Sequence, residues 1–223
     1  MTKKLNNLVL GLTILSGGIF CNQTNQSYQE TKNLEDKVVY ETFEKDTMEN
    51  GKNFNLSGDY KFSYEDLKKF DEHVNWTIKD SKENNKNSII IDKSEYTLYL
   101  IKAGEVDSKF PIELGSNPFE DKFLRGDGCT PEGIYNISWK RDIGQTIFYR
   151  AFLLNYPNEE DKTKNKTGSH VEIHGNGSGK SGNKDGSNWT LGCIALSNED
   201  IDLIFPYIND RDKVTIVRYT SKL

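Results

Sequence analysis

A cysteine and a histidine near the C-terminal end of the chain can together carry out covalent chemistry. Cys193 follows Gly192, and His174 precedes Gly175. A thiol has a reference pKa of about 8.5 and attacks as the thiolate, so it needs an imidazole or a set of backbone N–H groups beside it. Cys193 is therefore a candidate nucleophile, and His174 is the histidine in position to exchange protons with it.

The segment between these two residues is rich in glycine, so it can fold back and bring its ends together. Gly192 also permits a tight turn, which makes the amides of residues 191–193 candidates for binding an oxyanion. Composition and spacing leave a structural alternative open, because an isolated cysteine in a β protein is often a small buried apolar residue.

His170, Glu172 and His174 alternate along a predicted strand, so they project to one face. Two histidines and a carboxylate also suit a metal site. We favour a different arrangement, in which Val171 and Ile173 face the core. His170 and Glu172 then line the mouth of a cleft or face solvent, and no metal is predicted.

The elements that must position these residues are mostly strands. From residue 88 onward, short β-branched and aromatic runs alternate with turn signals. The runs are SIIID, EYTLYLIK, FPIEL, GIYNISW, TIFYRAFLLNY, SHVEIHG and KVTIVRY. One helix, SNEDIDLIFPYI, follows Cys193 with Ser197 as its predicted N-cap. The fold class is therefore mainly β.

The first third of the chain has a different character. Residues 59–86 have apolar side chains at the intervals of an amphipathic helix, with Ser63 as a candidate N-cap. Residues 22–58 are polar and acidic and have no such period, which predicts a flexible linker.

The N-terminus predicts export. Two lysines precede the apolar run LVLGLTILSGGIF, which is too short to span a bilayer comfortably and is typical of a signal peptide over residues 1–20. Cys21 follows at once, where a bacterial lipoprotein signal places the cysteine that is lipidated. A lipid anchor would tether the protein to a membrane surface. Phe20 departs from the small residues usual at that position, so ordinary secretion is the alternative.

Charge and cysteine content narrow the function further. The net charge is -5 and no basic stripe occurs, which argues against nucleic-acid binding. The chain has 3 cysteines. If Cys21 is lipidated, Cys129 and Cys193 remain, and a disulfide between them is conceivable in an oxidising compartment. The alternative, which the surroundings of Cys193 favour, is a free thiol kept for chemistry.

The stretch HVEIHGNGSGKSGNKDGSNWTLGCIALSNEDI resembles the L,D-transpeptidase catalytic domain, also called the YkuD domain, whose signature is His-Gly, a loop, and Ser or Thr, any residue, Gly and Cys. The matching residues are His174, Gly175, Thr190, Leu191, Gly192 and Cys193. RGDGCTPEGIYNI and EYTLYLIKAGEV leading to FPIELG are similar to two further family features. The resemblance covers residues 87–219 and implies a YkuD-type β-sandwich with one or two short helices.

The resemblance also implies an activity. Cys193 would attack a peptidoglycan stem peptide at its third residue, commonly meso-diaminopimelate, and release D-alanine, with His174 as proton donor and acceptor. An amine would then resolve the thioester. Oxyanion and substrate contacts would come from the residues around the motif, namely Thr190, Leu191, Gly192, Gly175 and Trp189. No cofactor is implied, and the expected location is the periplasm or cell envelope.

One position departs from the family pattern. Many members carry arginine two residues after the cysteine, whereas this chain has Ala195. The fate of the acyl group therefore stays open. The alternatives are an L,D-carboxypeptidase or an amidase that hydrolyses stem-peptide or wall-protein linkages, and an inactive lipoprotein that only binds the wall.

Overall fold

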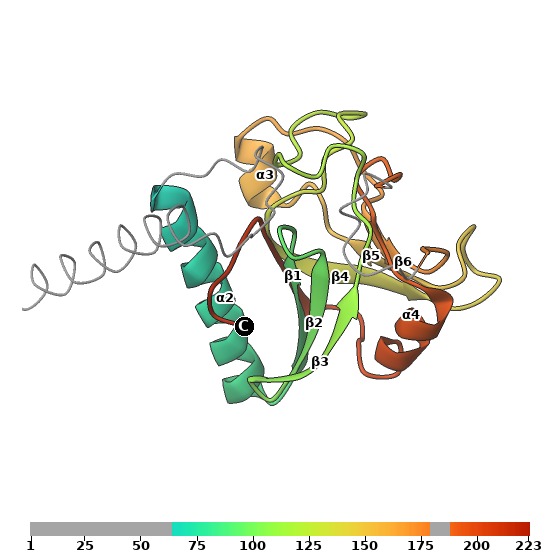
Figure 1. The fold of residues 1–223 in the computed structure, drawn as a ribbon, viewed down its shortest axis with the longest axis horizontal. Coiled ribbons are helices and arrows are strands. Elements are labelled where there is room, and N and C mark those ends of the chain that lie inside the picture. The colour runs from blue at the N-terminus through green and yellow to red at the C-terminus, as the bar shows by residue number, and fades with distance from the viewer. Residues whose placement is uncertain (1–63, 179–187) are drawn as a thin grey trace, which may run out of the picture. The chain divides into compact units, whose positions relative to one another are not determined.

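The computed structural model of the protein describes residues 64–178 and 188–223 (Figure 1). The predicted signal peptide, Cys21, the linker 22–58 and the candidate N-cap Ser63 lie outside these residues. Within the two described ranges, no helix has both the length and the apolar character needed to cross a membrane.

The strands form one curled sheet in the order β3-β2-β1-β8-β4-β5-β6-β7. They are β1 (Asn87–Asp92), β2 (Thr97–Lys102), β3 (Glu105–Pro111), β4 (Gly133–Arg141), β5 (Ala151–Leu154), β6 (Glu172–His174), β7 (Ile194–Ala195) and β8 (Lys213–Val217). Two pairs, β1–β8 and β6–β7, are parallel. The expectation of a mainly β fold is confirmed.

The long strand β4 joins the two parts of the sheet. Its first half, Gly133–Asn136, pairs with β8, and its second half, from Ile137 onward, pairs with β5. The register shifts between Ile137 and Trp139. Because one strand is shared in this way, the sheet can bend, and a single apolar core lies inside it with contributions from both parts.

The central strand β1 is buried on both faces, as its run of isoleucines predicts. Ile89 and Ile91 point into the main core, and Ile90 points the other way. There it meets helix α2 (Tyr64–Asn84), whose Phe70 and Val74 cover this face of the sheet. Figure 1 shows α2 lying beside β1 and β2. The N-terminal helix is therefore packed against the β domain.

Two short helices complete the fold. Helix α4 (Asn198–Ile204) begins as predicted, since the Ser197 side chain accepts a hydrogen bond of 3.0 Å from the Asp200 N–H. Helix α3 (Glu159–Thr163) was not expected from the sequence. A capping box between Asn158 and Asp161 starts it, so a local polar motif compensates for its short length.

Several predicted strands have different bounds in the structure. The run SHVEIHG, for example, forms a strand only over Glu172–His174. The run FPIEL contributes only its first residues to β3, and residues 112–115 instead make isolated bridges to the segment around Cys193. The run TIFYRAFLLNY forms a strand only over Ala151–Leu154. Its first residues lie outside the strand, and among them the Arg150 guanidinium pairs with Asp202 at 2.8 Å.

Candidate active site

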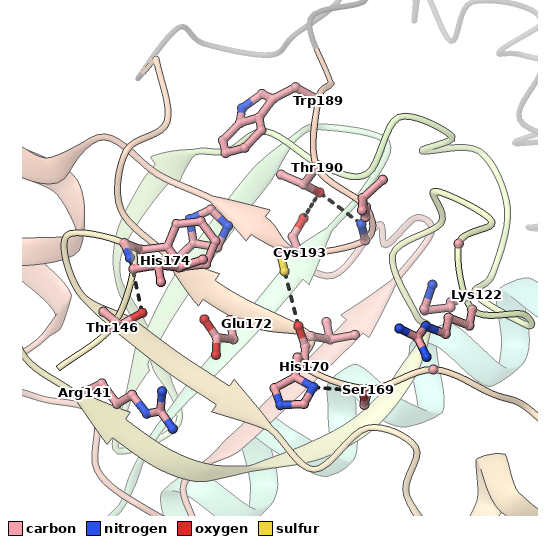
Figure 2. Close-up of a pocket in the computed structure, with 18 residues that line it drawn as sticks. Lys122, Arg141, Thr146, Ser169, His170, Glu172, His174, Trp189, Thr190 and Cys193 are labelled. Carbon is pink, nitrogen blue, oxygen red and sulfur yellow. Dashed lines mark hydrogen bonds between the residues drawn. The ribbon is translucent and has the colours of Figure 1, made fainter.

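The register of two short strands brings the predicted nucleophile and histidine to one face. His174 in β6 lies opposite Ala195 in β7. Because side chains alternate along a strand, Cys193 points to the same side as Ala195, and Glu172 points to the same side as His174. Figure 2 shows the side chains of Cys193, His174 and Glu172 in one pocket.

The pocket has a volume of about 660 Å³. Of the predicted site residues, those that line it are Cys193, His174, Trp189, Thr190, Leu191 and Gly192. Other lining residues come from the loop before β4, from the end of β4, from the loop before β5, and from the loop before β6 together with Glu172 in β6. Gly175 does not line the pocket, and its contribution is instead to hold His174.

His174 is fully buried, and the environment fixes its tautomer. Its Nδ1 lies 2.7 Å from the carbonyl oxygen of Gly175. A carbonyl only accepts, so Nδ1 carries the proton and Nε2 keeps a lone pair. Nε2 is buried and has no hydrogen-bond partner among residues 64–178 and 188–223. Burial lowers the pKa of His174 below 6.5, against the opposing effect of the Gly175 carbonyl. The ring is therefore a neutral base.

Two aromatic rings hold the imidazole in place. Phe148 stacks on His174 with ring centroids 3.6 Å apart and planes 7° apart. Trp189 meets it edge-on at 5.9 Å. Phe148 was missed by sequence reasoning, because it lies in a run predicted to be a strand. The two rings exclude water from the imidazole and leave it little freedom to rotate.

Cys193 is a half-buried free thiol. Its Sγ donates to the carbonyl oxygen of His170 at 3.5 Å (Figure 2). Burial raises the pKa of Cys193 to about 11, against a backbone hydrogen bond that lowers the pKa, and the charge of the Glu172 carboxylate adds to the rise. The residue is therefore a neutral thiol near pH 7. A neutral thiol beside a neutral imidazole requires that the proton move as the sulfur attacks.

The other thiol near the site has a structural environment. Cys129 is free and only 3% exposed, and its Sγ donates to the Asp127 carbonyl oxygen at 3.6 Å. The conceivable disulfide between Cys129 and Cys193 is not present, so the structure has the free Cys193 thiol that the preferred prediction requires.

The turn that carries Cys193 is closed by Thr190. The Thr190 hydroxyl donates to the Cys193 carbonyl oxygen at 2.7 Å and accepts from the Gly192 N–H at 3.1 Å. The Gly192 N–H, one of the predicted oxyanion donors, is therefore not available for an oxyanion, because it is bound to the threonine side chain. The amides of Leu191 and Cys193 remain as candidates, and the Leu191 side chain stands 75% exposed at the pocket rim.

Only glycine suits position 192, because the backbone there is in a conformation that other residues rarely adopt and no room exists for a Cβ atom. Its φ is +126°, and a Cβ would lie 2.4 Å from the Cys129 carbonyl oxygen. We expect Gly192→Ala to displace the Cys193 turn and to lower activity at least tenfold, in keeping with the sensitivity of reaction rates to small misplacements. Gly144→Ala is the matched control, because Gly144 has a φ of +80° with open space around its Cβ position. Equal activity of the two variants in a D-alanine release assay would contradict this role.

The second motif, RGDGCTPEG, builds the wall behind this turn. The Asp127 carboxylate accepts from the Phe123 and Leu124 N–H groups, both at 2.8 Å. It also accepts from the Cys129 N–H at 3.0 Å and from Lys122 Nζ at 2.7 Å. One carboxylate thereby holds the whole loop, which places the Cys129 carbonyl against Gly192. The motif supports the site without reaching Cys193.

Glu113 anchors Trp189 and was not predicted from the sequence. Its carboxylate is 3% exposed and accepts hydrogen bonds from Trp189 Nε1, from the Ser178 hydroxyl and from the Ser178 N–H, the last at 2.7 Å. The predicted contact residue Trp189 is thus fixed at its indole nitrogen while its ring lines the pocket. No local pattern reveals Glu113, because its partners are 65 and 76 residues away along the chain.

The three residues considered as metal ligands, His170, Glu172 and His174, do not all belong to one strand. His170 has a φ of +55° and precedes β6, so it does not share the alternation of Glu172 and His174. Val171 and Ile173 enter the core, as preferred from the sequence. Within the described ranges, no group of three or more His, Cys, Asp or Glu residues could hold a metal ion.

Residues 86–216 match the model of the L,D-transpeptidase catalytic domain, YkuD. The chain belongs to this family. The match includes both the His174-Gly175 pair and the Thr190 to Cys193 motif, so the family signature coincides with the pocket described above. The resemblance noted in the sequence is confirmed.

Curated YkuD relatives include YafK of Escherichia coli K12, whose name assigns it provisionally as an L,D-transpeptidase. It is 30% identical over 125 residues, which are 54% of this chain and 46% of YafK. The chain therefore spans less than half the length of this relative.

Solved structures give weaker similarity. The helical cell shape determining protein Pgp2 from Campylobacter jejuni is 25% identical, with a TM-score of 0.47 over 64% of this chain and 54% of Pgp2. Bd1075 from Bdellovibrio bacteriovorus is 25% identical, with a TM-score of 0.48 over 63% of this chain and 52% of Bd1075.

Proposed function

We propose that this YkuD protein is a cysteine-dependent acyltransferase that acts on peptidoglycan stem peptides. The observation that carries the proposal is the state of the Cys193 and His174 pair. The thiol and the imidazole line the same pocket. The Nδ1 contact with Gly175 leaves the lone pair of His174 on Nε2, and Nε2 has no hydrogen-bond partner in the part of the chain that the structure describes. A base with one nitrogen anchored and the other available is the arrangement that thiol activation needs.

In the first half of the reaction, Cys193 Sγ forms a bond to the carbonyl carbon of the third stem residue while His174 Nε2 takes the thiol proton. The tetrahedral intermediate then breaks its C–N bond. His174 returns the proton to the leaving nitrogen, and D-alanine departs. The product is a thioester on Cys193, with the stem shortened by one residue.

In the second half, an acceptor amine attacks the thioester carbonyl and loses a proton to His174. The C–S bond breaks, and Cys193 regains its proton. Water in place of the amine would give a carboxypeptidase or an amidase. Ala195 bears on this choice, because it occupies the position where many relatives carry arginine and lies fully buried opposite His174.

Product analysis with and without an added amine acceptor separates transfer from hydrolysis. A transferase is expected to convert a tetrapeptide stem into an acceptor amide, at the expense of free tripeptide, as the amine concentration rises. If free tripeptide is the sole product at every amine concentration while D-alanine is released, the enzyme is a hydrolase and the transfer step is wrong.

We also propose an organisation for the exported protein. Residues 1–20 act as a signal peptide, Cys21 is the lipidation site, residues 22–58 form the linker and residues 59–86 the helical lead-in to a catalytic domain over 87–219. The family is one of periplasmic cell-wall enzymes, which fits a lipid anchor that holds the domain near peptidoglycan.

A further inference from the structure

A buried lysine stands in the wall of the pocket, beside the turn that carries Cys193. Lys122 is 3% exposed and lines the pocket. Its Nζ donates to the Asp127 carboxylate at 2.7 Å and to the Leu124 carbonyl oxygen at 3.3 Å. Burying an ammonium is costly even when it is paired, and apolar residues often replace a buried ion pair without loss of stability. The charge at this position therefore points to a role beyond packing.

Two glycines hold the lysine side chain in place. A Cβ at Gly168 would lie 3.2 Å from Lys122 Cε, and a Cβ at Gly192 would lie 3.5 Å from Lys122 Nζ. Gly192 directly precedes Cys193. Gly168 lies two residues before His170, whose carbonyl oxygen accepts a hydrogen bond from the thiol. Lys122 therefore packs between the two segments that position the nucleophile.

The ion pair between Lys122 and Asp127 has its positive end toward the pocket. Among the described residues, Lys122 lines the pocket and Asp127 does not. The Asp127 carboxylate instead accepts from N–H groups of its own loop. Because the two charges lie at different distances from the pocket, Asp127 does not cancel the field of the ammonium there.

Charged groups lie on two sides of Cys193. The titratable and charged side chains that line the pocket with it are Lys122, Arg125, Arg141, His170, Glu172 and His174. Figure 2 shows Lys122 on the opposite side of Cys193 from Glu172 and His174. Burial raises the pKa of the thiol, the charge of Glu172 raises it further, and the charge of Lys122 lowers it. The ammonium therefore favours the negative charge that develops on Sγ as the thiol loses its proton.

We propose that Lys122 is a positioning residue for the nucleophile, which holds the Cys193 turn in place and supplies positive charge as the thiol proton leaves for His174. The proposal rests on the proposed function, because it takes Cys193 as the nucleophile. The distance between the ammonium and the turn is fixed, because Gly168 and Gly192 close on the side chain from two sides. Loss of the charge should therefore slow every reaction of the Cys193 thiolate.

Alkylation by iodoacetamide measures the Cys193 thiolate without any donor peptide. The reagent is neutral, so the lysine charge does not attract it, and peptide mass spectrometry reports the modification of Cys193 alone. Below the pKa of the thiol, the alkylation rate follows the thiolate fraction. We expect Lys122→Met, which keeps the stem and loses the charge, to slow alkylation at neutral pH by about threefold to tenfold.

Two further variants at the same position separate charge from hydrogen bonding. Lys122→Gln removes the charge but keeps an N–H group that can donate to Asp127, and it should slow alkylation by about threefold to tenfold as well. It also serves as the neutral variant if Lys122→Met does not fold. Lys122→Arg keeps the charge and should stay within about twofold of the wild-type rate.

Lys166→Met is the matched control. Lys166 is also a buried lysine with carboxylate partners, Asp121 at 2.6 Å and Asp161 at 3.0 Å, but among the described residues it does not line the pocket. Its replacement should leave alkylation of Cys193 within about twofold of the wild type. A loss of packing alone would expose the thiol and speed alkylation, which is the opposite of the change expected at Lys122.

The role of Lys122 is overturned if its neutral variants alkylate at the wild-type rate or faster, if Lys122→Arg is as slow as they are, or if Lys166→Met is. Release of D-alanine from a tetrapeptide stem separates this result from the proposed function, and Lys122→Met should lower its kcat/KM by about threefold or more. If the wild type releases D-alanine and all variants alkylate alike, only the role of Lys122 is wrong. If the wild type releases none while alkylation changes as expected, only the donor class is wrong.

Discussion

Replacing Cys193 with alanine is expected to lower the rate of D-alanine release by roughly a thousandfold or more, because Cys193 carries the only thiol among the described residues that line the pocket. The imidazole and the rest of the pocket would remain, so substrate should still bind. Release of D-alanine from a tetrapeptide stem, followed under reducing conditions, measures the effect.

The chain supplies a matched cysteine for this experiment. Cys129→Ser changes a thiol that is buried outside the pocket lining and donates only to the Asp127 carbonyl, a bond that a serine hydroxyl can also make. Its activity should stay within a few-fold of the wild type. If Cys193→Ala keeps the parent rate, or if Cys129→Ser loses activity as completely as Cys193→Ala, the assignment of the nucleophile is wrong.

The pH profile of acylation is expected to have an acid limb set by His174. Below its pKa the ring is protonated and cannot accept the thiol proton, so kcat/KM should rise with pH through a value lower than 6.5. Above that limb the profile should be flat across the usual assay range, since Cys193 ionises only at about 11. Measurement of kcat/KM for D-alanine release against pH tests both features.

Phe148→Ala makes this prediction specific to the structure. Removing the stacked ring admits water to the imidazole, so the pKa of His174 should rise toward 6.5 and the acid limb should move to higher pH. Phe148→Leu, which keeps an apolar side chain there, should shift it less. A wild-type profile with an acid limb well above 6.5, or an unchanged limb in Phe148→Ala, would contradict the general-base account.

The candidate site residues could be predicted from the sequence. The His174-Gly175 pair and the Thr190 to Cys193 motif each consist of neighbouring residues. Such motifs can be recognised in the sequence without knowledge of how the strands pair. The N-cap at Ser197 and the strand formed by SIIID were predictable for the same reason, since both depend on neighbours a few residues away.

Contacts between distant segments were not predictable. The Glu113 carboxylate accepts from donors more than sixty residues later in the chain, and Phe148 stacks on His174 from the segment before β5. The Thr190 hydroxyl takes the Gly192 amide, a choice that spacing alone does not reveal. These contacts fix the position of Trp189, the plane of the His174 ring and the amides left to bind an oxyanion.

Intact-protein mass spectrometry after incubation with a tetrapeptide stem tests the central claim most directly. The account predicts a covalent adduct whose mass equals the donor minus D-alanine, located on Cys193 and missing from Cys193→Ala. An acceptor amine should shorten its lifetime. D-alanine release without any adduct on rapidly quenched protein, or the same adduct on Cys193→Ala, would contradict a thioester at Cys193.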